Sequence, residues 1–212
     1  MQFTSEPVDV DDYHAAVELF FERGWTDGLA IVPPTEDLVE AMIGASGREP
    51  HEEIGEIPPV QGIATIEKLA VNSVMAGCRP EYFPIVIAAV EAMLEPEHNL
   101  NGVQTTTHCC VPLVIVNGPI ATQLKFNASD GVFGNGFRAN GTVGRAIRLI
   151  LWNLGGNIPG ETQVLSITIY DHVEALEYGQ AHWLAGGLLL LSFSMLMMVY
   201  VFNRRFSIMQ GS

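Results

Sequence analysis

The spacing of apolar residues in the first half of the chain predicts helices separated by glycine- and proline-rich turns. Aspartate, threonine or proline begins each of these segments, and most of them end at glycine, as helix-capping preferences require. The predicted helices cover residues 12–23, residues 35–44, residues 65–76 and residues 80–94. Between the second and third helices, residues 44–62 are rich in glycine and proline and predict a long surface loop.

Two short runs of aliphatic and β-branched residues predict strands. Leu29 to Val32 is stopped by two prolines, and Val103 to Val116 combines threonines with side chains that favour a pleated, buried environment. A glycine-rich loop at residues 131–141 then leads into a helix that ends at Gly155. This mixture predicts an α/β or α+β soluble domain over residues 1–156.

The last part of the chain has a different pattern. Trp183–Phe202 is twenty residues without a charged side chain, enough to cross a bilayer core of roughly 30 Å as a helix. Trp183 and Tyr200 lie near its ends and Arg204 and Arg205 follow, as interfacial anchors do. We therefore expect a single transmembrane helix at residues 183–202, after a junction and interfacial segment at residues 157–182 and before a short tail at residues 203–212.

The charge and the cysteine content of the chain limit which binding partners and which cellular compartment we expect. The net charge is −14, and the first 60 residues hold fourteen acidic side chains against two basic ones. Such an acidic surface repels phosphate backbones, so nucleic acid is not an expected partner. Three cysteines, two of them adjacent, make a poor disulfide framework and suit a reducing compartment. The N-terminus has no signal-peptide pattern, so we expect the soluble domain in the cytoplasm and the helix in the inner membrane.

Cys78 is the first candidate for a catalytic residue. It lies between the end of one predicted helix and the start of the next, beside Arg79. The positive end of a helix dipole and a neighbouring arginine both lower the pKa of a thiol. The sequence therefore predicts a reactive thiolate at Cys78, although a small buried residue in a tight turn explains the same position.

His108, in the segment TTTHCC, is the second catalytic candidate, as a base. His108 and Cys110 would share one face of a strand while Cys109 points to the other face, which allows two ligands of a metal site but not four. Buried structural cysteines remain the alternative. The sequence identifies no cofactor.

Three further residues are candidates for substrate binding. Arg138 and Asn140 lie in the glycine-rich loop before a helix, where backbone N–H groups and a guanidinium could bind an anion. Asp27, in GWTDG, could line a pocket, but an aspartate in a turn needs no further reason.

Residues 24–156 resemble an uncharacterised bacterial family. The resemblance rests on GWTDGLAIVPPTED, MAGCRPEY, NGVQTTTHCCVPLVIVNGPI and FGNGFRANGTVGRAIRLIL, and the family is associated with selenoproteins that carry a UGSC motif. In this family the position of His108 is shared, whereas the two following positions are proline or small apolar residues. The resemblance implies no reaction, and it implies that the domain is truncated.

From about residue 156 to residue 205 the chain resembles the C-terminal end of a molybdate ABC transporter permease. The resemblance implies a last periplasmic segment, a last membrane helix and a cytoplasmic arginine tail, and transporter subunits or another transmembrane helix as partners. One helix cannot build a translocation path. The two resemblances abut at NLGGNIPGET, which predicts a chimera.

Three functions follow from these expectations. The first is an enzyme-like domain fused to a membrane anchor, with a thiol-dependent reaction as its candidate chemistry. The second is a permease-related membrane protein without independent transport activity, and the third is a non-functional fusion. The positive-inside rule places Arg204 and Arg205 in the cytoplasm, which conflicts with a cytoplasmic soluble domain. We expect the domain to be cytoplasmic.

Overall fold

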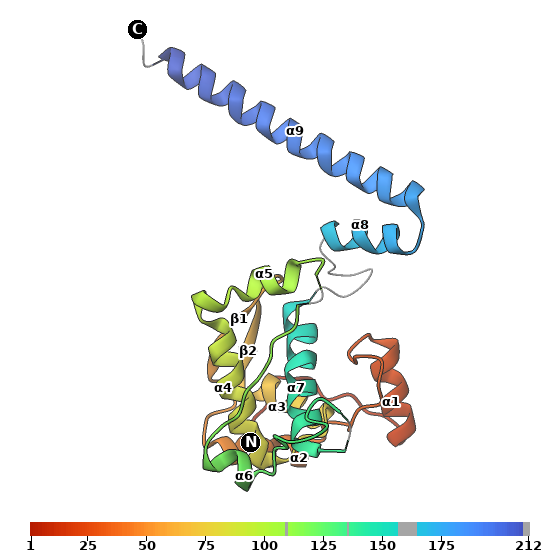
Figure 1. The fold of residues 1–212 in the computed structure, drawn as a ribbon, viewed down its shortest axis with the longest axis vertical. Coiled ribbons are helices and arrows are strands. Elements are labelled where there is room, and N and C mark those ends of the chain that lie inside the picture. Colours follow the sequence, from red (N-terminus) through yellow and green to blue (C-terminus); the bar gives the residue numbers. More distant parts are fainter. Residues whose placement is uncertain (109, 135, 157–164, 210–212) are drawn as a thin grey trace. The chain divides into compact units, whose positions relative to one another are not determined.

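The computed structural model describes residues 1–108, 110–134, 136–156 and 165–209 of the 212-residue chain. These residues belong to two compact units, Met1–Thr162 and Gln163–Ser212. The first unit contains the main hydrophobic core, and the described part of the second consists of two helices (Figure 1).

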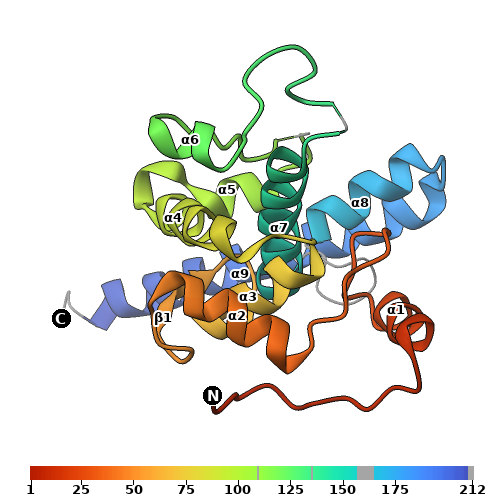
Figure 2. The same cartoon turned by 90° about the horizontal axis from the view of Figure 1, so that it is seen from below.

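The first unit is built mainly from helices around a buried central helix, α3 (Ile66–Met75). Eight of the ten residues of α3 are buried. The helices α2 (Glu36–Ser46), α4 (Phe83–Leu94) and α7 (Arg138–Gly155) all contact α3, and their apolar side chains form one core cluster (Figures 1 and 2). Three further helices belong to this unit: α1 (Tyr13–Glu22), α5 (Leu100–Thr105) and α6 (Pro119–Gln123).

Helix ends in this unit follow local capping signals. The side chains of Asp12 and Thr65 accept hydrogen bonds from N–H groups in the first turns of α1 and α3, at 2.8 and 3.3 Å. Gly24 and Gly77 follow the same two helices with φ angles of 65° and 84°, a conformation that glycine adopts at little cost. The helices predicted at residues 12–23, 65–76 and 80–94 are confirmed. The helix predicted from residue 35 runs on to Ser46, and the helix predicted after the glycine-rich loop begins earlier, at Arg138.

The only sheet in the described residues lies where a loop was predicted. Within residues 44–62 and just beyond, β1 (Glu53–Ile57) pairs antiparallel with β2 (Gly62–Thr65). Ile57 and Ala64 point into the core. A Cβ at Gly62 would collide with the backbone carbonyl of Leu154 in α7, so only glycine lets this hairpin pack against the helix.

The strand predicted at Leu29–Val32 is wrong. The segment follows a bend that includes Leu29, and its backbone groups form hydrogen bonds with partners that are not strands. The N–H of Val32 donates to the carbonyl oxygen of Met75 at 3.1 Å, and Arg145 occupies the carbonyl oxygens of Leu29 and Ala30.

The strands predicted over Val103–Val116 are also wrong. Asn99 caps α5, which takes the first residues of the segment into a helix. After α5 the described backbone bends at Thr107 and His108, and residues 110–117 form no helix and pair with no strand in the described part of the chain. The outward side chains of this segment, Val111, Leu113 and Ile115, are between 68% and 76% exposed.

The second unit consists of α8 (Leu165–Glu174) and α9 (Tyr178–Met209), which contact each other. Within the described residues, α9 is the one helix long and apolar enough to cross a membrane, over Tyr178–Phe202. It includes the span predicted at residues 183–202, whereas α8 was not predicted.

The fold class is therefore corrected in part. The described residues contain no parallel sheet, so the α/β alternative does not hold. The first unit is mostly helical with one small antiparallel hairpin, which is the α+β alternative in a coarse form, and a candidate membrane helix follows it.

Candidate functional site

A cavity of about 600 Å³ lies inside the first unit. Its walls come from the N-terminal segment, α1, the segment after α1, α2, α3 and the end of α7. Phe3, Phe20 and Trp25 contribute aromatic walls, and the rings of Phe20 and Trp25 meet edge to face with centroids 5.4 Å apart. Its volume is in the range of small-molecule sites.

Glu67 forms hydrogen bonds with the N-terminal segment beside this cavity. Its carboxylate is 1% exposed and accepts hydrogen bonds from the N–H and hydroxyl groups of both Thr4 and Ser5. Burial raises the pKa of Glu67, but these hydrogen bonds outweigh burial and leave the pKa below its ordinary value. Glu67 therefore stays ionised at neutral pH and holds residues that lie more than sixty positions away in the sequence.

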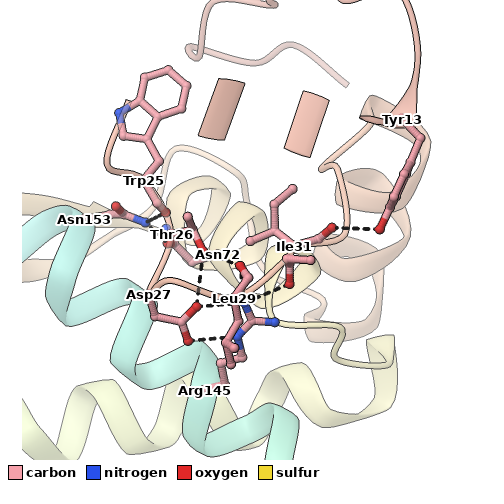
Figure 3. Close-up of polar contacts among 10 residues, drawn as sticks. Tyr13, Trp25, Thr26, Asp27, Leu29, Ile31, Asn72, Arg145 and Asn153 are labelled. Atoms are coloured by element: carbon pink, nitrogen blue, oxygen red, sulfur yellow. Dashed lines mark hydrogen bonds and ion pairs between the residues drawn. The ribbon is translucent and has the colours of Figure 1, made fainter. Parts of the chain in front are cut away.

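Asp27 and Arg145 form a double ion pair that fixes the segment after α1 (Figure 3). Arg145 donates to the two carboxylate oxygens of Asp27 at 2.8 and 2.9 Å. Burial raises the pKa of Asp27, but Arg145 outweighs it and leaves the pKa lowered. Both charges are thus satisfied within the protein, and the substrate-binding role predicted for Asp27 stays a prediction.

A chain of amide groups links α3 to the end of α7 beside the cavity (Figure 3). The side-chain nitrogen of Asn153 donates to the carbonyl oxygen of Trp25 at 3.2 Å and to Oδ1 of Asn72 at 2.7 Å. Asn72 in turn donates to the carbonyl oxygen of Lys68. Oδ1 of Asn153 is buried and has no hydrogen-bond donor among the described residues. Sequence reasoning missed Asn72 and Asn153, although both are polar positions within otherwise apolar helices.

The structure places Cys78 and Arg138 together. The guanidinium of Arg138 donates to the carbonyl oxygen of Gly77 at 2.9 and 3.1 Å, and the thiol of Cys78 donates to the carbonyl oxygen of Thr142 at 3.3 Å. Cys78 is only 7% exposed, and this burial raises its pKa to about 11 despite the nearby Arg138. The expected lowering of the pKa is therefore wrong, because burial outweighs the hydrogen bond to Thr142 and the charge of Arg138.

His108 and Cys110 have other interaction partners than Cys78 and Arg138. His108 is exposed, and its backbone N–H donates to the hydroxyl of Thr106. In the described part of the chain, no hydrogen bond or ion pair joins His108 to Cys78 or Arg138. Cys110 is exposed and free, and Cys109 lies outside the described residues.

A metal site at His108 and Cys110 gains no further ligand in the structure. No group of three or more His, Cys, Asp or Glu side chains within the described residues could hold a metal ion. The predicted pair, and the catalytic role predicted for His108, stay predictions.

Asn140 fastens the loop that precedes α7. Its side-chain oxygen accepts from the N–H of Asn127 at 2.9 Å, and its side-chain nitrogen donates to the carbonyl oxygen of Asn127 at 3.0 Å. Both ends of the amide are thus used within the protein. Arg138 and Asn140 thus form hydrogen bonds with backbone groups of other segments, and substrate binding by either one stays a prediction.

The second unit offers a surface of another kind. None of the most apolar part of α9 is buried within the chain, and large apolar side chains are exposed on all sides of the helix. A helix on the surface of a water-soluble protein keeps a polar face, whereas a helix that is apolar all round needs protein or lipid around it. The hydroxyl of Ser194 donates to the carbonyl oxygen of Leu190 at 2.8 Å, so this polar group is satisfied inside the helix.

Comparison with known proteins bears on this apolar helix. No protein-family model matches the chain, and no solved structure matches it. Over 167 residues the chain is 33% identical to the molybdenum transport system permease protein ModB of Azotobacter vinelandii, a match that covers 74% of this chain and 66% of ModB. Much of the chain is similar to a molybdenum permease.

The match to ModB extends beyond the segment on which the sequence resemblance rested. Residues 157–212 are about a quarter of the chain, so a match over 74% of it includes a large part of the first unit. A permease-like region is thereby supported. The chain spans less than two thirds of the length of ModB. The resemblance of residues 24–156 to another family, and the junction near residue 156, stay predictions.

Proposed function

We propose that the chain is a permease-related membrane protein of a bacterial molybdenum transport system, held in the inner membrane by α9. The similarity to ModB carries this proposal, and the apolar helix supports it independently. This function takes precedence over a thiol-dependent enzyme, because Cys78 is buried with a raised pKa and no described contact links it to a base.

The dimensions of α9 suit a membrane span. Tyr178–Phe202 is 25 residues, which at 1.5 Å per residue gives a helix of about 37 Å. That length exceeds the roughly 30 Å of a bilayer core and leaves room for tilt. No Asp, Glu, Lys or Arg occurs in the span.

One helix cannot enclose a translocation path, so α9 would act as an anchor that pairs with a membrane helix of another subunit. Gly187 and Ser194 are seven positions apart and therefore lie on one face of α9, with Leu191 between them. Small residues let two helices approach closely in lipid. Leu196 lies on the opposite face. A permease subunit of the same transport system is the partner that the similarity to ModB favours.

Photo-crosslinking in bacterial membranes tests this pairing. A photoreactive residue replaces Leu191 on the small-residue face or, as the matched control, Leu196 on the opposite face. We expect the probe at position 191 to give an adduct with the permease subunit several times more abundant than the probe at 196. Adducts in equal amounts from both faces, or none with a permease subunit, would contradict the proposal.

We further propose that α9 crosses the membrane once, with the first unit in the cytoplasm. Cys110 is exposed and reports the side on which this unit lies. A membrane-impermeant maleimide should label the variant that keeps Cys110 as its only cysteine after the cells are permeabilised, and not in intact cells. Labelling in intact cells would place the first unit outside, as Arg204 and Arg205 favour under the positive-inside rule.

A further inference from the structure

Residues 1–11, here called the strap, form one wall of the cavity. The strap contains no helix or strand, and Phe3 is the one residue in it that is partly buried. Figure 2 shows it as a coil that runs beside α2 to the start of α1. The residues of the strap that line the cavity are Phe3, Ser5, Glu6, Pro7, Val8 and Val10. This wall of the cavity is therefore made by a segment without regular structure.

Two carboxylates hold the strap to the rest of the first unit. Glu67 of α3 accepts hydrogen bonds from the N–H and hydroxyl groups of Thr4 and Ser5, at distances between 2.5 and 3.2 Å. The amino group of Met1 forms an ion pair with Glu40 of α2 at 2.5 Å. Within the part of the chain that the structure describes, no other hydrogen bond or ion pair joins the strap to the protein. Glu67, which is 1% exposed, thus carries most of the polar attachment.

The helix α1, which follows the strap, is held at both of its ends. Near its start, the hydroxyl of Tyr13 donates to the carbonyl oxygen of Ile31 at 3.2 Å. After its end, the indole nitrogen of Trp152 in α7 donates to the carbonyl oxygen of Gly24 at 2.9 Å. Asp12 caps α1 and therefore marks the point at which a moving strap would meet a fixed helix.

Little apolar packing holds the strap in place. Phe3 packs against the edge of the core, whereas Val8 and Val10 are 54% and 43% exposed. The strap borders a cavity of about 600 Å³, so much of its inner side faces open space rather than close-packed side chains. A segment with few buried apolar contacts opens locally at a smaller free energy than the whole protein needs to unfold.

We propose that the strap opens and closes over the cavity by turning about Asp12, and that Glu67 is the latch that holds it closed. Opening breaks the hydrogen bonds from Thr4 and Ser5 to Glu67 and removes the wall that the strap contributes. The strap thereby controls the access of small molecules to the cavity. This motion belongs to the first unit and does not depend on α9.

Hydrogen exchange of the full chain in lipid nanodiscs measures the opening. The N–H groups of Thr4 and Ser5 exchange only after they leave Glu67, so their protection reports the latch. Thr4→Val/Ser5→Ala removes both hydroxyl donors and keeps both N–H donors. It should lower the protection of these two N–H groups roughly tenfold or more, because hydrogen bonds to a charged group are lost.

The rest of the protein supplies the controls for this experiment. Exchange within α3 should stay the same in Thr4→Val/Ser5→Ala, since the strap opens without unfolding the core. Thr105→Val removes a hydroxyl that donates within α5, to the carbonyl oxygen of Asn101, and should leave the protection of Thr4 and Ser5 unchanged.

A cysteine in the cavity wall tests whether opening uncovers the cavity. Val39→Cys places a thiol at a position that lines the cavity and is 3% exposed. When it is combined with Thr4→Val/Ser5→Ala, iodoacetamide should modify position 39 roughly tenfold faster or more, in step with the weakened latch. The rate at buried Cys78 should not change. Met75→Cys replaces Val39→Cys if circular dichroism shows that this variant does not fold.

Three results would overturn the proposal. Unchanged protection of Thr4 and Ser5 in the latch variant would mean that Glu67 does not hold the strap. Faster exchange that α3 and Cys78 share would mean that the strap leaves only when the core unfolds. An unchanged rate of modification at position 39 would mean that the strap does not close the cavity.

Discussion

At the residue scale, polar side chains of the first unit form hydrogen bonds and ion pairs between segments that are distant in the sequence. Glu67 binds Thr4 and Ser5, and Arg145 binds Asp27. The partners are 118 positions apart in the case of Asp27 and Arg145. The sequence singled out Asp27 but gave no sign of its partner, because nothing local in the sequence records which arginine folds back onto the turn.

The tie at Glu67 predicts a pH dependence. Since its pKa is lowered in the folded state, the stability that it contributes is present above the unfolded pKa of about 4.3 and is lost as the pH falls through the folded pKa. Glu67→Gln should lower the free energy of unfolding at pH 7 by about 2 kcal/mol, since hydrogen bonds to a charged group are lost. Glu56→Gln, on the exposed edge of β1, is the matched control. Denaturant unfolding followed by tryptophan fluorescence at pH 7 and pH 4 measures both.

At pH 4 the difference between the wild type and Glu67→Gln should shrink. A difference that stays constant, or one that grows as the pH falls, would mean that the ionised carboxylate does not hold the N-terminal segment.

The thiols give a second prediction at this scale. Burial raises the pKa of Cys78 to about 11, so at pH 8 only about one thiol in a thousand is ionised. Iodoacetamide should therefore modify exposed Cys110 at least a hundredfold faster than Cys78, and both at similar rates in denaturant. Mass spectrometry of the digested protein locates the label. Rapid modification of Cys78 in the folded protein would restore it as a reactive thiol.

At the scale of elements, features with local causes could be predicted and features that depend on distant partners could not. Asp12 and Thr65 begin their helices by bonding within three residues, and the sequence identified both. Residues 110–117 have the composition of a strand, yet the described chain supplies no strand beside them. The hairpin at Glu53–Thr65 was missed because its glycine and proline residues are typical of a loop. In the structure, the side chains of Ile57 and Ala64 hold the hairpin in the core.

The hairpin yields a prediction with a matched control. Gly62→Ala would place a Cβ against the backbone carbonyl of Leu154, so the backbone of β2 or α7 must move. We therefore expect the free energy of unfolding to fall by roughly 2–4 kcal/mol. Gly44→Ala places a methyl group in open space within α2 and should stabilise the protein by up to about 1 kcal/mol. Thermal or denaturant unfolding distinguishes the two. Equal effects would mean that β2 does not approach α7 as closely as the structure has it.

At the scale of the whole molecule, the chain combines a charged, water-facing unit with an apolar helix. The first 60 residues carry most of the net charge of −14, whereas Tyr178–Phe202 carries no Asp, Glu, Lys or Arg. The sequence predicted this helix because a membrane span depends on length and local composition alone. The candidate site was harder to predict, since the cavity draws its walls from α1, α2, α3 and α7 at once.

The central claim is that α9 integrates the chain into a membrane. Alkaline carbonate extraction of membranes from bacterial cells tests it most directly, with the double variant Leu190→Arg/Leu191→Arg and the control Leu190→Val/Leu191→Val. Each arginine at the centre of a span costs about 2.5–3.5 kcal/mol on insertion. We predict that the wild type and the valine control stay in the membrane pellet and that the arginine variant moves to the supernatant. Complete release of the folded wild-type chain by carbonate would contradict the account.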